Sequence, residues 1–184
     1  LIERIGGLSD IEICAIAAAA PSRRRRSDNL LFRLLYRLEL RVGAIPAATN
    51  SGLAHDIPRI ALNDNEVLHT LAPDVILDLS GNHGAGIPAA APRHGVWFTD
   101  ATGSVPGIAG LQPLIEGRPV SSINLFRRPN AQPLPELIAS AAVNSKFVAA
   151  RNEQILEEKS VALILRELKR VARGLPDAKP SETA

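Results

Sequence analysis

A near-continuous apolar stretch, Pro73-Asp-Val-Ile-Leu-Asp-Leu-Ser80, lies in the middle of the chain. A strand that is buried on both faces, such as a central strand of a parallel sheet, shows a run of this kind instead of an alternation of apolar and polar residues. We therefore predict a central parallel strand here. Asp78 lies inside it, and a buried carboxylate needs hydrogen bonds or a charge partner to offset its desolvation. Asp78 is thus either a site residue or a member of a structural network.

Strand and helix patterns alternate on both sides of this stretch. Further strands are predicted at residues 11–19, 58–62, 95–99, 120–126 and 137–143, and helices at residues 28–41, 65–71 and 145–173. In the last helix, the spacing predicts that Leu165, Leu168 and Ala172 are buried. The alternation indicates an α/β protein. We predict a Rossmann-like three-layer fold with a mostly parallel central sheet, as one domain over residues 1–174, and a disordered tail over residues 175–184.

The composition is that of a globular protein. Of 184 residues, 46% are hydrophobic and 22% charged, with a formal net charge of +2. No apolar run approaches the ~20 residues of a membrane span, so we expect a cytoplasmic protein without a transmembrane segment. Cys14 is the single cysteine, which excludes an internal disulfide. Because the chain begins at Leu1 and contains no methionine, we expect a truncated N-terminus from which a first strand is missing.

Three later motifs accompany the central strand: Gly95-Val-Trp97, Ile115-Glu-Gly-Arg-Pro-Val120 before a strand, and Asn152 ahead of a Lys-Ser helix. Together with residues 73–80, this order resembles the formyltransferase catalytic-domain superfamily, typified by the N-terminal domain of methionyl-tRNA formyltransferase. The likeness is to the divergent branch associated with sugar-transferring domains. It implies a Rossmann-like fold and transfer of a formyl group from 10-formyltetrahydrofolate to an amine by an Asn, His and Asp set.

This chain departs from that catalytic set. The family's Asn falls on Phe98 and its His on Asp100, and no aspartate lies between Asp100 and Asp177 to act as the third member. An amine that attacks a formyl carbon needs a base for its proton and a donor for the developing oxyanion. The loss predicts a degenerate domain, a pseudoenzyme that binds a carrier or partner, and the resemblance implies a link to modified-sugar or glycan metabolism.

The alternative is an active enzyme in which Asp100, with His94 or His83, replaces the family's set. It would use 10-formyltetrahydrofolate and an amino sugar or similar amine as substrates. Ligands of open α/β sheets bind at the carboxyl ends of the strands. The residues that we predict to bind substrate or cofactor there are Asp78, Ser80, Asn82, Trp97, Thr102 and Gly103.

The sequence lacks the signatures of two other kinds of site. The four histidines lack zinc-ligand spacing, and no Gly-x-Gly-x-x-Gly follows a strand, so neither a metal nor a dinucleotide site is expected.

For Asn82 and His83, which we predict as site residues, the competing interpretation is a solvated loop that caps a turn.

A cationic run consists of Arg23, Arg24, Arg25 and Arg26. It suits the phosphates of nucleic acid, a phosphorylated sugar or an anionic membrane surface, although with only 3% aromatic residues there is no strong nucleic-acid signal. A solvated face is the competing interpretation. A non-catalytic anion-binding module that uses this run is the third functional hypothesis.

Overall fold

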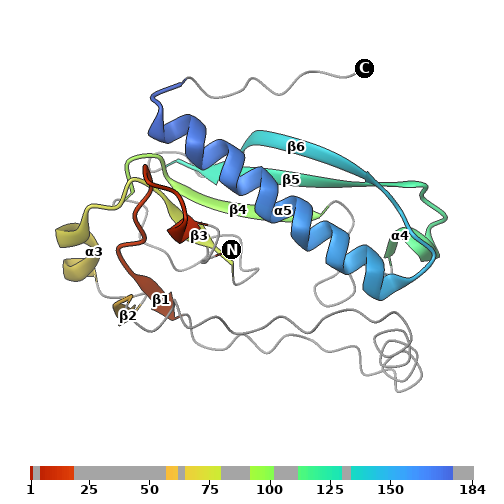
Figure 1. The fold of residues 1–184 in the computed structure, drawn as a ribbon, viewed down its shortest axis with the longest axis horizontal. Helices are drawn as coiled ribbons and strands as arrows, with labels where there is room; N and C mark the ends of the chain where they lie inside the picture. Colours follow the sequence, from red (N-terminus) through yellow and green to blue (C-terminus); the bar gives the residue numbers. More distant parts are fainter. Residues whose placement is uncertain are drawn as a thin grey trace.

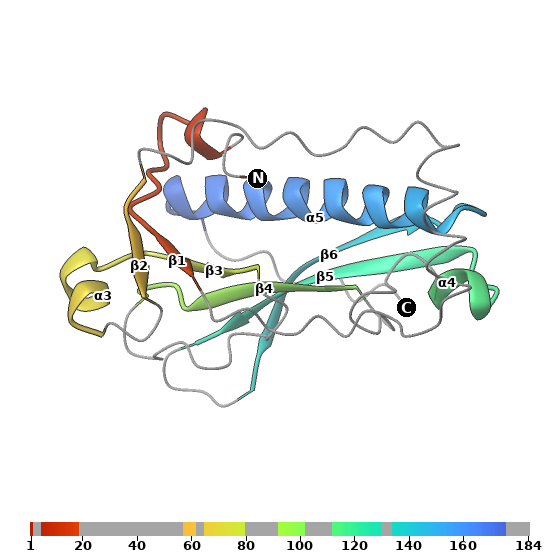
Figure 2. The ribbon, with the colours of Figure 1, turned by 90° about the horizontal axis from the view of Figure 1, so that it is seen from below.

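The computed structural model of the chain describes residues 1, 5–18, 57–61, 65–79, 92–101, 112–129 and 134–175. Its main feature is a four-stranded sheet in the order β3-β4-β5-β6, and one long helix, α5, runs along one face of it (Figures 1 and 2). The bounds are Ile76–Asp78 for β3, Val96–Ala101 for β4, Val120–Arg128 for β5, Glu136–Asn144 for β6 and Ala149–Ala172 for α5. Helices and strands thus share one packed unit, and the predicted α/β class is confirmed.

The sheet is mixed, which corrects the expectation of a mostly parallel central sheet. β3 pairs with β4 in parallel, but β4 with β5 and β5 with β6 pair antiparallel. For β5 and β6 the reason lies in the connection between them. A parallel crossover needs a dozen or more residues, and the connection from Arg128 to Glu136 is too short for one. β5 and β6 therefore form a hairpin.

A second, two-stranded sheet pairs β1 (Ile16–Ala18) with β2 (Arg59–Ala61) in parallel. These strands and helix α3 (Asn65–Leu71) lie toward one end of the molecule, whereas the short helix α4 (Gln112–Ile115) lies at the other (Figures 1 and 2). The predicted helix over residues 65–71 is confirmed, and β1 and β2 fall inside the strands predicted at residues 11–19 and 58–62. The predicted helix at residues 28–41 lies outside the described residues.

The core lies between the sheet and α5. From the sheet come Trp97, Ile123 and Leu125, which are 1%, 0% and 0% exposed. From α5 they meet Leu156, Leu163, Ile164 and Leu168. Removal of so much apolar surface from water is what holds the helix on the sheet. The core is almost entirely aliphatic, as a chain with few aromatic residues requires.

The buried stripe of α5 differs in one position from the prediction. Leu168 is buried and Leu165 packs partly buried against the core, but Ala172 is exposed. The stripe continues through Val171 instead, because a step of three residues from Leu168 keeps the same helix face toward the sheet. None of the helices in the described ranges is long and apolar enough to span a membrane.

Candidate binding face of the sheet

Side chains of a strand alternate between the two faces of its sheet. Trp97 belongs to the core beneath α5. Phe98 and Asp100 lie one and three positions after it in the same strand, so they project from the opposite face. We call this opposite face the rear face. Its members, by register with Phe98 and Asp100, are Asp78, Asn124, Phe126, Leu137 and Ser140.

A polar row crosses the rear face. Asp100 in β4 is the register partner of Asn124 in β5, and Asn124 is the partner of Ser140 in β6. Directly opposed residues of antiparallel strands place their Cβ atoms about 4.5–5.5 Å apart. The Ser140 hydroxyl donates to Asn124 Oδ1 at 2.8 Å, and the amide nitrogen of Asn124 has no partner among the described residues.

The polar row combines three kinds of hydrogen-bonding group. The carboxylate of Asp100 accepts, the amide of Asn124 donates and accepts, and the hydroxyl of Ser140 does both. Asp100 and Asn124 are half-buried, and Ser140 is exposed. The row is thus accessible at the β6 side and becomes more enclosed toward β4, a gradient that suits a small polar molecule lying across the strands.

An apolar row lies beside the polar row. The rings of Phe98 and Phe126 are stacked with centroids 5.6 Å apart and an interplanar angle of 22°, and Leu137 is the register partner of Phe126. Phe98 is only 4% exposed, whereas Phe126 is half-buried. The rear face therefore offers part of one aromatic ring next to the polar row.

Asp78 and Asp100 lie at the carboxyl ends of neighbouring parallel strands. Asp78 is the last residue of β3 and the register partner of Phe98, and Asp100 lies two residues further along β4. Both belong to the rear face, and Asp78 is 8% exposed. The structure thus brings together two of the predicted site residues at the edge of the sheet where ligands of α/β proteins bind.

His94 lies at the other end of β4. Asp100 lies four positions beyond Val96 along the extended strand, a rise of about 13 Å at ~3.3 Å per residue, and His94 lies two positions before Val96. Its backbone is held there by a 2.7 Å bond from its N–H to the carbonyl of Asp74. The predicted partnership of Asp100 with His94 is wrong, because the length of one strand separates them.

Trp97 is also corrected as a ligand-binding residue. It is buried in the core on the α5 side, and its Nε1 donates to the His94 carbonyl at 3.0 Å. A bound molecule on the rear face does not reach it. The remaining predicted site residues lie outside the described residues: Ser80, Asn82, His83, Thr102, Gly103 and Arg23, Arg24, Arg25 and Arg26.

Asn124 and Ser140 were not predicted as site residues. The alternation in residues 120–126 does indicate that Asn124 points away from the core. The alternation does not reveal the register that sets Asn124 opposite Asp100, because register depends on pairing with another strand.

In the described part of the chain, no group of three or more His, Cys, Asp or Glu residues is arranged to hold a metal ion.

No family model matches the chain, and no curated protein matches it either. The likeness to formyltransferases thus depends on the sequence motifs alone.

Proposed function

We propose that this protein is a cytoplasmic, formyltransferase-like domain of Rossmann-like architecture that has lost catalysis and binds an amino sugar or similar small amine on the rear face. The observation that carries the proposal is the polar row, Asp100, Asn124 and Ser140, beside the half-buried ring of Phe126. A carboxylate attracts an ammonium group. The amide and the hydroxyl suit sugar hydroxyls, and an aromatic ring suits the apolar C–H face of a sugar.

The order of the strands supports the kinship. The resemblance requires the strand that contains Trp97 to lie beside the strand that contains Asp78, and Leu77 and Trp97 are register partners in the parallel pair of β3 and β4. An arrangement that separated these strands would have removed the basis of the proposal.

Loss of catalysis is supported by the position that corresponds to the family's Asn. Phe98 occupies it, is 4% exposed and stacks on Phe126. It has no polar group with which to stabilise an oxyanion. The histidine nearest in sequence to Asp100, His94, lies at the opposite end of β4, so it does not assist Asp100 as a base.

The test is a binding titration of the protein with glucosamine, and with glucose as the sugar that lacks the amine. We expect glucosamine to bind and Asp100→Asn to weaken it by about tenfold, because a charge-assisted hydrogen bond contributes roughly 1.5–3 kcal/mol. Glu158→Gln, on α5 at the far side of the sheet, is the matched control and leaves binding unchanged. Glucosamine binding that is absent, or indifferent to Asp100→Asn, refutes the proposal.

One observation favours the competing function, active formyl transfer. Asn124 faces Asp100, so an amide donor and a carboxylate base are adjacent, although the family's own pair is missing. In this case the protein transfers a formyl group from 10-formyltetrahydrofolate to the bound amine. Turnover of glucosamine with this donor, abolished by both Asp100→Asn and Asn124→Ala, would establish catalysis in place of binding alone.

The third hypothesis is an anion-binding module that uses Arg23, Arg24, Arg25 and Arg26. It is based on the sequence alone, because these residues lie outside the described residues. It predicts binding to polyanions that weakens with added salt. Replacement of the four arginines by alanine then removes the binding and leaves glucosamine binding intact.

A further inference from the structure

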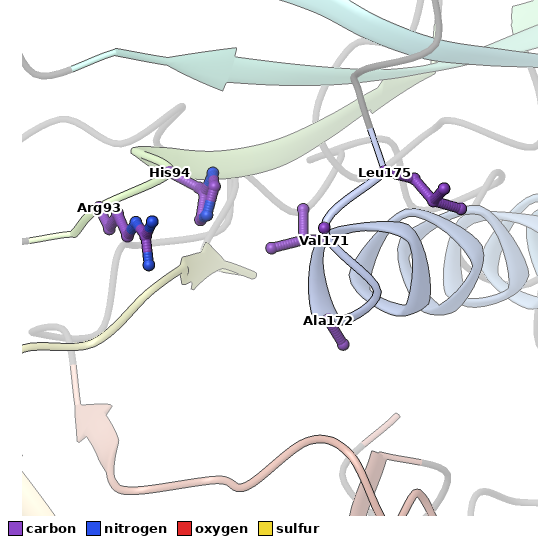
Figure 3. A pocket seen from close by; sticks show the side chains of 6 residues that line it. Arg93, His94, Val171, Ala172 and Leu175 are labelled. Carbon is purple, nitrogen blue, oxygen red and sulfur yellow. The ribbon is translucent and has the colours of Figure 1, made fainter.

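A pocket of about 360 Å³ lies between the turn that precedes β4 and the C-terminal end of α5. Its lining comprises Arg93, His94, Val171, Ala172, Gly174 and Leu175. Figure 3 shows Arg93 and His94 next to each other on one side, with Val171, Ala172 and Leu175 across from them. Two nitrogen-bearing side chains therefore face a mainly apolar wall.

The turn that presents Arg93 and His94 is held on both sides. The N–H groups of Arg93 and His94 donate to the carbonyls of Pro73 and Asp74 at 3.2 and 2.7 Å. The carbonyl of His94 accepts the indole N–H of Trp97 at 3.0 Å. The backbone beneath the two side chains is thus fixed before any ligand arrives, which reduces the entropy lost on binding.

The same turn packs directly on β5. Gly95 has φ +77°, and a Cβ at this position would lie 2.4 Å from the carbonyl oxygen of Arg128. The end of β5 therefore contributes Arg127 and Arg128 to the same end of the sheet. Arg127 pairs with Glu136 at 2.7 Å, whereas Nε of Arg128 is buried without a hydrogen-bond partner among the described residues.

Positive charge is in excess around this pocket. The last turn of α5 contains Lys169 and Arg170, and Arg173 follows it. Glu167 neutralises Arg170 at 3.3 Å. Arg93 makes no ion pair within the described ranges, and the exposed Asp74 is the carboxylate next to the turn. The surplus favours a negatively charged ligand.

The C-terminal end of a helix normally disfavours an anion, because its unsatisfied carbonyls are negative. Here the last turn is capped. The N–H groups of Arg173, Gly174 and Leu175 donate to the carbonyls of Lys169, Val171 and Arg170 at 3.2, 2.9 and 3.0 Å. The capped carbonyls and the neighbouring cations together reduce the repulsion of an anion at this end of α5.

We propose that this pocket binds a phosphate monoester group. The guanidinium of Arg93 donates to two phosphate oxygens, as its planar fork permits, and the ring of His94 donates to a third. Val171 and Leu175 contact the carbon atoms that bear the phosphate. The site goes beyond the proposed function, because it lies at the opposite end of β4 from the polar row and shares no residue with it.

The test titrates the full chain with inorganic phosphate and with glucose 6-phosphate, which lacks the amine that the rear face is proposed to bind, and measures co-sedimentation with phosphatidylcholine vesicles that contain or lack phosphatidic acid. We expect Arg93→Ala to weaken phosphate binding by about tenfold or more. Arg93→Lys should retain part of it, since the charge remains but the fork is lost. Circular dichroism verifies that each variant is folded.

The control is Arg118→Ala. Arg118 has a side chain 52% exposed, pairs with Glu116 at 2.6 Å and follows α4 at the other end of the molecule. It should leave phosphate binding unchanged. Binding of glucose 6-phosphate that Arg93→Ala weakens indicates a soluble ester, and recruitment to phosphatidic acid vesicles that Arg93→Ala abolishes indicates a lipid headgroup. Absence of binding to all three probes, or equal losses in Arg93→Ala and Arg118→Ala, overturns the proposal.

Discussion

Leu77 and Trp97 lie side by side as register partners in the parallel pair of β3 and β4. Both side chains face α5, where Trp97 is 1% exposed and Leu77 packs against the same core. Because alternate residues point to opposite faces, this one pairing also places Asp78 and Phe98 together on the rear face. The core and the candidate site are therefore set by the same two strands.

Replacement of Trp97 by alanine should destabilise the protein strongly. The residue is fully buried, and truncation of a large aromatic side chain in a core costs roughly 3–5 kcal/mol. Urea denaturation measures the loss as a lower transition midpoint. Phe147→Ala is the control, since Phe147 is 99% exposed and its truncation should change the free energy of unfolding by less than about 0.5 kcal/mol. Similar losses for the two variants would contradict the assignment of Trp97 to the core.

Gly95→Ala and Gly117→Ala should differ in stability although both glycines have positive φ. Gly117 has φ +62°, and apart from its chain neighbours no described residue lies within 4 Å of the place that a methyl group would take, so alanine there bears the conformational cost alone, about 1–2 kcal/mol. Gly95 adds a clash, because its Cβ would lie 2.4 Å from the Arg128 carbonyl oxygen. We expect a clearly larger loss for Gly95→Ala in thermal unfolding. A loss no greater than that of Gly117→Ala would mean that β4 and β5 do not pack this closely.

Asn152→Ala should destabilise the start of α5. The side chain is 3% exposed, its Nδ2 donates to the carbonyl of Lys146 at 2.7 Å and its Oδ1 accepts the N–H of the same residue. The N-cap, Val148, makes no side-chain cap bond, so Asn152 ties the preceding loop to the helix. Loss of these buried bonds should cost roughly 1–3 kcal/mol.

Asn152→Asp provides the comparison for that variant. Aspartate retains an acceptor for the Lys146 N–H but loses the donor to the Lys146 carbonyl. Its second carboxylate oxygen would also face the Lys146 carbonyl in a buried place, so its free energy of unfolding at neutral pH should be no higher than that of Asn152→Ala. Hydrogen exchange of the first turn of α5 localises the effect, and an Asn152→Ala variant with unchanged exchange there would refute the role.

Asn124 and Ser140 should be coupled energetically. Their hydrogen bond crosses from β5 to β6 at a partly exposed position, and cross-strand polar pairs contribute roughly 0.2–1 kcal/mol. A double-mutant cycle of Asn124→Ala and Ser140→Ala isolates this term. Additive effects of the two single variants would show that the pair is not formed. Ser140 would then not be linked to Asn124 in the polar row.

Several elements were predictable because their signals are local. The helix over residues 65–71 and the strand inside residues 73–80 follow from apolar spacing and from turn residues at their ends. The parallel fraction of the sheet was not, because the connection from Ala101 to Val120 is long enough for either a parallel or an antiparallel pairing of β4 with β5. The candidate site was predictable only in part. Strand patterns in the sequence indicate Asp78 and Asp100 as site residues, whereas Asn124 and Ser140 are recognised only from their register with Asp100.

The amino-acid sequence by itself determined which segments are buried, since apolar runs and periodicity act within one segment. It determined the α/β class and the position of Asp100 near the end of a strand. Tertiary structure alone decided that Asn124 faces Asp100, that Trp97 belongs to the core, and that His94 meets the end of α5. The physical reason is that strand register and helix docking join residues far apart in the chain, and a local pattern has no information about a distant partner.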